Sequence, residues 1–175
     1  MKRLEDMIRT QGTALNADVL LVDSFLNNRV DYDLMADVGR AFADAARDMA
    51  VDLVVTIEAS GIAPALMTAQ ALNVPLVIMK KSASRTLTEG ILQKEVFSFT
   101  KNAAYQLTLK KKFIPSGARV LLIDDFYTTG STAESCCEAL REMKPAGLTV
   151  LVYAVRTPQE EIWRKGKRPY GSAGQ

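Results

Sequence analysis

The sequence contains no histidine. This absence excludes a Ser-His-Asp or Cys-His catalytic mechanism and any metal site built on histidine. The two cysteines, Cys136 and Cys137, are adjacent on a predicted helix and therefore point to different faces. We expect free thiols in the core or partly exposed, as is typical of a reducing cytoplasm, and no disulfide.

Long apolar runs and a strong net charge are also missing. No run is long enough to cross a bilayer, and the amino terminus has no apolar signal region, so we expect a cytoplasmic protein without a membrane partner. A formal charge of +2 gives no argument for a nucleic-acid partner. The 175 residues, 48% of them hydrophobic, fit a single domain with a sizeable core. We expect that domain to span residues 1–159, and residues 160–175 to form a basic, poorly ordered tail.

The richest chemistry lies in residues 120–132. A short apolar run predicts a buried strand that ends at Asp124 and Asp125, and a hydroxyl-rich loop with a glycine then opens a helix. The amino end of a helix favours phosphate, whereas ionised carboxylates only accept hydrogen bonds and so suit sugar hydroxyls. The segment therefore predicts a sugar-phosphate site whose phosphate is held by Thr128, Thr129, Gly130, Ser131 and Thr132. The alternative is a strand that merely ends in a polar turn and a capped helix.

A second anion site is predicted one strand-helix unit earlier. After a buried strand at residues 53–57, small residues and a glycine lead into a helix, so that backbone amides could face an anion at Glu58, Ala59, Ser60 and Gly61. A simple strand-to-helix turn would explain the same pattern. Lys80 and Lys81 follow the strand at residues 76–79, where open α/β sheets place their ligands, although solvated lysines are the ordinary interpretation. Both sites together would suit a substrate that carries a pyrophosphate.

Strands that alternate with helices predict an α/β fold with a mostly parallel, doubly wound sheet. We expect a helix at residues 3–10, a strand at 19–22, a helix running to about 49 from a cap at Asp31 or Asp33, and helices at 65–72 and 133–143. Residues 82–94 are predicted to form a lid loop, and residues 96–100 and 104–109 a β-hairpin. Within residues 23–28, Phe25 and Leu26 either pack the loop on the next helix or form an apolar wall over a flat ligand.

The strand, the acidic pair and the Thr-Thr-Gly-Ser-Thr loop resemble the phosphoribosyl pyrophosphate (PRPP) signature of the type I phosphoribosyltransferases. Within that family, the sequence is similar to the bacterial xanthine phosphoribosyltransferases. The residues that carry this similarity are 22–27, 55–65, 97–101 and 123–126. The resemblance implies a type I phosphoribosyltransferase fold with a small amino-terminal hood at about residues 1–30 and a flexible lid loop.

The resemblance also implies a function. It implies a homodimeric enzyme of purine salvage that converts xanthine and PRPP to xanthosine monophosphate (XMP) and pyrophosphate with Mg²⁺, carried mainly by the substrate's oxygens. Asp124 and Asp125 would hold the ribose hydroxyls, and Leu20 and Asn27 would belong to the hood over the purine. The sequence offers no strong general base, and a purine as acidic as xanthine needs less help to lose its proton.

The chain departs from that pattern in two segments. The family usually has Leu-Ala-Asn-Gly after Asp-Asp-Phe, where this chain has Tyr127-Thr128-Thr129-Gly130, and phosphate binding should survive because the glycine and the helix amides remain. The family's Glu-Lys-Ser-Phe-Gln run, whose lysine contacts the purine, corresponds to residues 155–159, where Arg156 keeps the charge but presents a planar fork. Beyond Gln159 the motifs no longer match. A guanine or hypoxanthine transferase and a non-catalytic, PRPP-binding purine regulator therefore stay open as alternatives.

Overall fold

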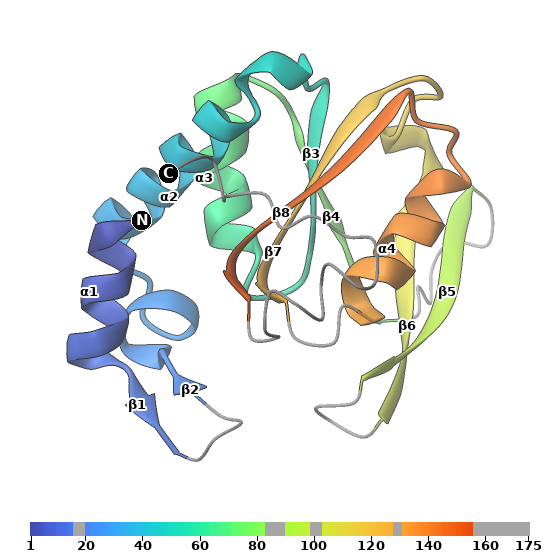
Figure 1. The fold of residues 1–175 in the computed structure, drawn as a ribbon. Coiled ribbons are helices and arrows are strands. Elements are labelled where there is room, and N and C mark those ends of the chain that lie inside the picture. Colours follow the sequence, from blue (N-terminus) through green and yellow to red (C-terminus); the bar gives the residue numbers. More distant parts are fainter. Residues whose placement is uncertain (16–19, 83–89, 99–102, 128–130, 156–175) are drawn as a thin grey trace, which may run out of the picture.

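A parallel sheet of four strands forms the centre of the molecule, in the order β4-β3-β7-β8 (Figure 1). The structure is a computed structural model, and it describes residues 1–15, 20–82, 90–98, 103–127 and 131–155. The strands are β3 (Leu53–Ile57), β4 (Leu76–Met79), β7 (Arg119–Tyr127) and β8 (Gly147–Val155). Val55 of β3 lies beside Val77 of β4 on one side and Leu122 of β7 on the other. The pairings of β3 with β4, β3 with β7 and β7 with β8 are all parallel. The predicted mostly parallel α/β sheet is confirmed.

Helices cover both faces of this sheet. Helix α3 (Ile62–Leu72) packs on one face, with α2 (Tyr32–Ala45) beside it, and α4 (Ser131–Arg141) lies on the other face (Figure 1). Alternate residues of β3 and β7 serve the two faces: Val54 and Leu121 join the cluster around Ala65, whereas Val55 and Leu122 join the cluster around Leu140. Because both faces are buried, β3 and the middle of β7 are mostly apolar, which is why their sequence runs predicted these strands correctly.

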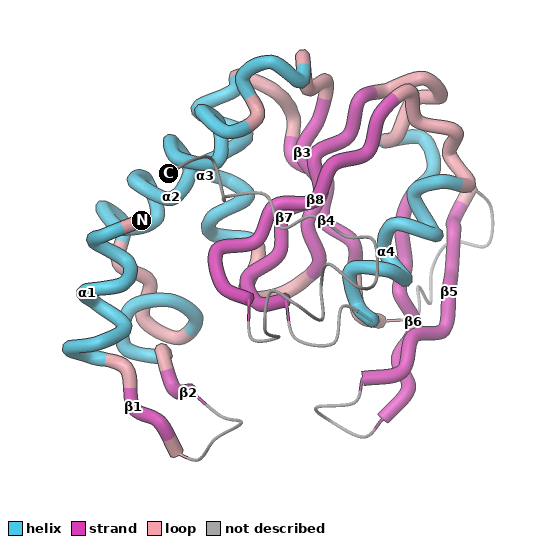
Figure 2. Tube along the Cα trace, in the orientation of Figure 1, coloured by secondary structure: helices cyan, strands magenta, loops and turns pink. Residues whose placement is uncertain are grey.

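An antiparallel hairpin extends the fold beyond β4. Strands β5 (Ile91–Ser98) and β6 (Ala103–Lys110) pair with each other, and Lys80 and Thr108 join the hairpin to the end of β4 by reciprocal backbone hydrogen bonds of 2.9 and 2.8 Å (Figure 2). Lys94 forms an ion pair with Glu138 of α4. The predicted hairpin is confirmed, but it begins earlier than expected. The predicted lid is therefore wrong from Ile91 onward, and residues 83–89 of it lie outside the described residues.

A small amino-terminal unit packs against α2. We use this name for α1 (Lys2–Gln11), β1 (Thr13–Ala14), β2 (Leu20–Leu21) and the π-helix Asp23–Asn27. Phe25 and Leu26 are only 1% and 2% exposed and pack with Leu34 of α2. This placement confirms that they pack the loop on the helix, and the alternative of an apolar wall over a ligand is wrong. The unit corresponds to the predicted hood.

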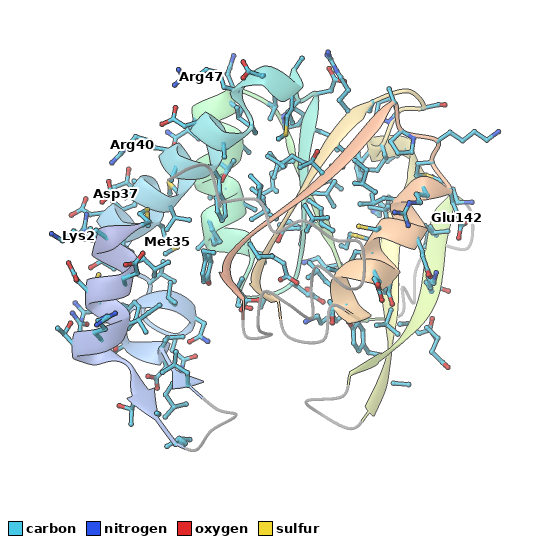
Figure 3. The ribbon with its side chains drawn as sticks, in the orientation of Figure 1. Lys2, Met35, Asp37, Arg40, Arg47 and Glu142 are labelled. Atoms are coloured by element: carbon cyan, nitrogen blue, oxygen red, sulfur yellow. The ribbon has the colours of Figure 1, made fainter. Side chains whose placement is uncertain are left out.

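Polar contacts fix the same unit to α2 from outside. Arg3 of α1 donates to Asp37 at 2.6 Å, and Asp37 also pairs with Arg40. Figure 3 shows Asp37 and Arg40 on the side of α2 that faces away from the sheet. Asp31 caps α2 by accepting from the backbone N–H of Leu34 at 2.8 Å, as its position in the sequence predicted.

Several element boundaries differ from the predictions. Strand β7 continues through the acidic pair to Tyr127, α3 starts at Ile62 rather than residue 65, and α2 ends at Ala45 before a 3₁₀ turn, Arg47–Met49. A second 3₁₀ turn, Lys111–Phe113, follows β6. The thiols of both cysteines are free and buried, as expected. Over the described ranges, no helix is long and apolar enough to span a membrane, and the expected tail at residues 160–175 lies outside those ranges.

Candidate active site

The acidic pair, Asp124 and Asp125, lies at the carboxyl end of β7. Consecutive side chains of a strand point to opposite faces of the sheet, so the two carboxylates lie on different faces. Asp124 faces the α4 side and is 8% exposed, next to Cys136, while Asp125 is half-buried on the other side, near Tyr153 of β8. The backbone N–H of Asp125 donates to the Asp124 carboxylate at 3.0 Å. The two carboxylates therefore project on both sides of one strand end.

Burial and mutual repulsion make this pair costly to ionise together. Burial and the charge of Asp125 raise the pKa of Asp124 to about 7, while Lys81 lowers it. Burial and the same two carboxylates raise the pKa of Tyr153 above its ordinary range. A ligand that donates hydrogen bonds, or brings positive charge, would favour the ionised form of Asp124.

The loop after β3 is held against the end of β4 by Glu58. Its backbone N–H donates to the Met79 carbonyl at 3.0 Å, its carboxylate accepts from the Lys81 N–H at 2.5 Å, and the carboxylate pairs with the Lys80 ammonium at 3.2 Å. The peptide between Glu58 and Ala59 is cis. The prediction that the Glu58 amide faces an anion is therefore wrong, because that amide already has an acceptor. Glu58 instead fixes both lysines beside the loop.

The rest of this loop fits the predicted anion site. In the described part of the chain, no acceptor is recorded for the backbone N–H groups of Ala59, Ser60 and Gly61. A side chain at Gly61 would place its Cβ 2.4 Å from the Thr56 hydroxyl oxygen, so only glycine allows the loop to turn so close to β3. The Thr56 hydroxyl is fixed in turn, because it donates to the Ile123 carbonyl of β7 at 2.8 Å. The loop and the acidic strand are thereby tied together.

Lys81 lies over an aromatic ring that the sequence did not single out. Its ammonium is 5.5 Å from the centroid of the Tyr105 ring on β6. Thr108 of the same strand donates its hydroxyl to the Ser82 carbonyl at 2.7 Å, which fixes the chain directly after the lysines. The Tyr105 ring on β6 thus holds the Lys81 ammonium, and the Glu58 carboxylate holds the Lys81 backbone beside the loop.

The predicted phosphate loop lies only partly within the described residues. Thr128, Thr129 and Gly130 fall outside them, and Ser131 begins α4. Thr132, in the first turn of α4, is half-buried and lies close to the Tyr105 hydroxyl. Since Tyr105 also lies near Asp124, the amino end of α4 and the acidic pair share one edge of the sheet.

Two of the three predicted purine contacts lie among the described residues. Leu20 is 39% exposed on β2, Asn27 is exposed at the end of the π-helix, and Arg156 lies outside the described residues. The link that the structure does provide is Tyr153, which packs against the buried cluster of the amino-terminal unit while lying near the acidic pair. Sequence reasoning missed Tyr105 and Tyr153 because an aromatic residue in an alternating strand resembles ordinary core.

A sheet edge with paired carboxylates, lysines, the amides of the loop after β3 and a helix amino end suits a substrate with a sugar, a phosphate and a second anionic group. A model of the phosphoribosyl transferase domain matches residues 32–167. The chain belongs to the phosphoribosyltransferase family, and within it to the xanthine phosphoribosyltransferases of bacteria. The xanthine phosphoribosyltransferase of Streptococcus gordonii is 42% identical over 100% of this chain and 88% of that relative. The one from Streptococcus agalactiae is 44% identical over 87% of this chain and 80% of that relative.

These matches extend past Gln159, where the sequence motifs stopped matching. The domain model ends at residue 167, and the Streptococcus gordonii relative aligns with the whole chain. The expectation that the similarity ends at residue 159 is therefore wrong.

Solved structures support the fold. The adenine phosphoribosyltransferase of Saccharomyces cerevisiae has a TM-score of 0.71 with 16% identity, and 97% of each chain is covered. The adenine phosphoribosyltransferase of Leishmania tarentolae has a TM-score of 0.63 with 18% identity over 90% of this chain and 92% of that one. At such identities the likeness establishes the type I phosphoribosyltransferase fold and does not bear on the base.

Proposed function

We propose that this protein is a purine-salvage enzyme that transfers the 5-phosphoribosyl group of PRPP to xanthine, giving XMP and pyrophosphate. The bond from the anomeric carbon to the pyrophosphate oxygen breaks, a bond from that carbon to a ring nitrogen of xanthine forms, and the nitrogen loses its proton. The observation that carries the proposal is the Asp124-Asp125 pair on the strand that runs directly toward α4. The names and the identities of the bacterial relatives support xanthine as the base.

The acidic pair would bind the ribose. Ionised Asp124 and Asp125 accept hydrogen bonds from the 2′- and 3′-hydroxyls, and these donors offset the repulsion that raises the pKa of Asp124. The 5′-phosphate would lie at the amino end of α4, against Thr128, Thr129, Gly130, Ser131 and Thr132. Holding the sugar at both ends fixes the anomeric carbon for attack.

The pyrophosphate would lie between the loop after β3 and the lysines. The amides of Ala59, Ser60 and Gly61 and the ammonium groups of Lys80 and Lys81 would stabilise its charge as it departs. Glu58 would contribute to this site through its carboxylate, which pairs with Lys80 and accepts from the Lys81 N–H, and not through its amide.

Mg²⁺ fits this arrangement as an ion carried mainly by the substrate. Among the described residues no group of three or more acidic or thiol side chains could hold a metal, and the Glu58 carboxylate is already paired with Lys80. Mg²⁺ commonly takes one or two carboxylates together with substrate phosphate oxygens, and Asp124 and Asp125 at the end of β7 could supply them. When bound, the ion would neutralise charge on the leaving pyrophosphate.

The base would be selected by the amino-terminal unit together with the segment after β8. Leu20 and Asn27 would cover the purine, and Arg156 would read its oxygen-bearing edge. We also propose a cytoplasmic homodimer, as the resemblance implies.

The test is the stoichiometry of the reaction. Purified protein with PRPP, Mg²⁺ and xanthine should form XMP and pyrophosphate in equal amounts, identified by chromatography and mass. Asp125→Asn should lower kcat/KM at least about tenfold, because it weakens a charged hydrogen bond to the substrate. Glu142→Gln, in the exposed turn directly after α4 (Figure 3), is the matched control and should leave the rate unchanged. PRPP binding without any XMP would refute the enzyme and favour the regulator.

A further inference from the structure

Tyr105 contacts more of the proposed PRPP site than any role in core packing requires. Its ring lies under the Lys81 ammonium at 5.5 Å, and its hydroxyl lies close to Thr132 at the start of α4. The ring also packs against the central core cluster from β6. One side chain therefore touches the proposed pyrophosphate side and the proposed 5′-phosphate side at once.

The hydroxyl of Tyr105 is the unusual part of this arrangement. It is buried, and in the described part of the chain no group meets it with full hydrogen-bond geometry. Burial raises its pKa, and the interaction with Thr132 lowers it. Buried hydroxyls normally have a partner, and phenylalanine would fill a purely apolar position without this cost. The hydroxyl is thus a buried polar group beside the first turn of α4, and core packing alone does not explain it.

The ring has a separate effect on Lys81. A cation over a ring face is attracted by the ring quadrupole, which restricts a side chain that otherwise has many rotamers. The backbone below is fixed as well, through the Lys80 and Thr108 hydrogen bonds and the Thr108 bond to Ser82. The hairpin therefore determines where the Lys81 charge stands relative to Asp124, whose pKa that charge lowers.

We infer that Tyr105 is a positioning residue for PRPP, with its ring holding Lys81 for the pyrophosphate and its hydroxyl orienting Thr132 for the 5′-phosphate. The inference rests on the proposed function and assigns a role to the hairpin that the sequence motifs do not contain. It concerns PRPP alone, because Tyr105 packs against the central core cluster, whereas the amino-terminal unit proposed to bind the base has a cluster of its own.

Three variants separate the two effects. Tyr105→Phe keeps the ring and removes the hydroxyl, Tyr105→Leu removes both, and Lys81→Gln removes the charge that the ring holds. Tyr32→Phe, at a tyrosine that is 65% exposed, is the matched control. Binding of PRPP with Mg²⁺ is measured by calorimetry, KM is measured for both substrates, and melting temperatures confirm that each variant is folded.

We expect Tyr105→Phe to raise the Kd and the KM for PRPP about three- to tenfold, with the KM for xanthine unchanged. This is the change associated with the one hydrogen bond that the hydroxyl would form with Thr132 when PRPP is bound. Tyr105→Leu should weaken PRPP binding more than Tyr105→Phe does. This extra loss of affinity should disappear when Lys81 is also replaced by Gln, because the ring acts through Lys81. Wild-type affinity in Tyr105→Phe, or additive effects of Tyr105→Leu and Lys81→Gln, would overturn the inference. Wild-type protein that binds no PRPP would instead refute the proposed function itself.

Discussion

Arg119 and Asp52 join the starts of β7 and β3 by side-chain and backbone hydrogen bonds. The Asp52 carboxylate accepts from the Arg119 side chain, from Nε at 2.9 Å and from Nη2 at 2.6 Å, and from the Arg119 backbone N–H at 2.7 Å. The backbone N–H of Asp52 returns a hydrogen bond to the Arg119 carbonyl at 2.9 Å. This pair fixes the amino ends of two strands whose carboxyl ends carry the acidic pair and the Glu58 loop, so it helps to set the register of the site.

This pair predicts a defined response to acid. The Arg119 side chain and backbone hydrogen bonds lower the pKa of Asp52 from 3.8 to about 2. A carboxyl with a lowered folded-state pKa stabilises the fold fully above its unfolded pKa, and this stabilisation is lost as the pH falls through the folded value. Asp52→Asn should therefore melt below wild type at pH 7, with the difference shrinking as the pH falls from about 4 toward 2. Asp48→Asn, at an exposed acid of the 3₁₀ turn, is the control; equal melting of Asp52→Asn and wild type at pH 7 would contradict the assignment.

Asp124 predicts the opposite dependence on pH. Burial and the Asp125 charge raise its folded-state pKa to about 7, against 3.8 for an ordinary aspartate. The folded state then binds the proton more tightly, so this group's contribution is fully present below about pH 4 and is lost as the pH rises through about 7. Among the described residues, Tyr105, Lys81, Cys136 and Tyr153 are further titratable groups near Asp124.

Asp124→Asn removes this titration. The melting temperature of the variant, relative to wild type without substrate, should rise between about pH 4 and pH 8. The same comparison with saturating PRPP should show a smaller difference, because the sugar hydroxyls favour the ionised carboxylate. A constant difference across that range would show that Asp124 is not the group that titrates.

Gly61 predicts a steric limit in the proposed pyrophosphate loop. An added Cβ would lie 2.4 Å from the Thr56 hydroxyl oxygen, which is buried and held by the Ile123 carbonyl. Gly61→Ala should lower the free energy of unfolding by about 1–3 kcal/mol and also weaken PRPP binding. Gly147→Ala is the matched control, since its nearest neighbour is the Arg119 Cγ at 3.8 Å. Chemical denaturation gives the free energy of unfolding of both variants. Equal values for the two would count against the close approach of Gly61 to the Thr56 hydroxyl.

Gly39 predicts a loss of stability that leaves the chemistry intact. At this point α2 approaches α3 so closely that an added Cβ would lie 2.5 Å from the Met67 Cβ and 2.6 Å from its backbone carbonyl carbon. Gly39→Ala should cost about 1–3 kcal/mol of unfolding free energy while the KM for PRPP stays within about twofold, because the contact lies away from the sheet edge. A raised KM with unchanged melting would contradict this separation.

The sequence predicted the central strands because burial on both faces makes their runs apolar, as at Leu53–Ile57. It placed the end of β7 too early, because Asp124 and Asp125 interrupt the apolar run although the strand continues to pair with β8 at Asp124, Phe126 and Tyr127. It placed the start of β5 too late, because Gln93, Lys94 and Glu95 are polar in a strand that packs against α4. Apolar patterns report burial, and these strand ends are defined by backbone pairing.

The candidate site was predictable where single segments carry the chemistry, as in the acidic pair. It was not predictable where the contact joins distant segments. Glu58 was expected to offer its amide, yet it binds Lys80 and Lys81 across the gap between two strands. Tyr105 gave no signal, since its contacts with Lys81 and Thr132 depend on how the hairpin folds back on the sheet.

The most direct test of the central claim is the ratio of kcat/KM values for xanthine, guanine and hypoxanthine, each measured with saturating PRPP and Mg²⁺ and the Asp125→Asn variant alongside. The proposal predicts that xanthine has the highest value and that the variant loses activity with every base, because the ribose site is common to all three. A higher value for guanine or hypoxanthine would contradict the assignment of xanthine, and activity that survives in Asp125→Asn would contradict the site.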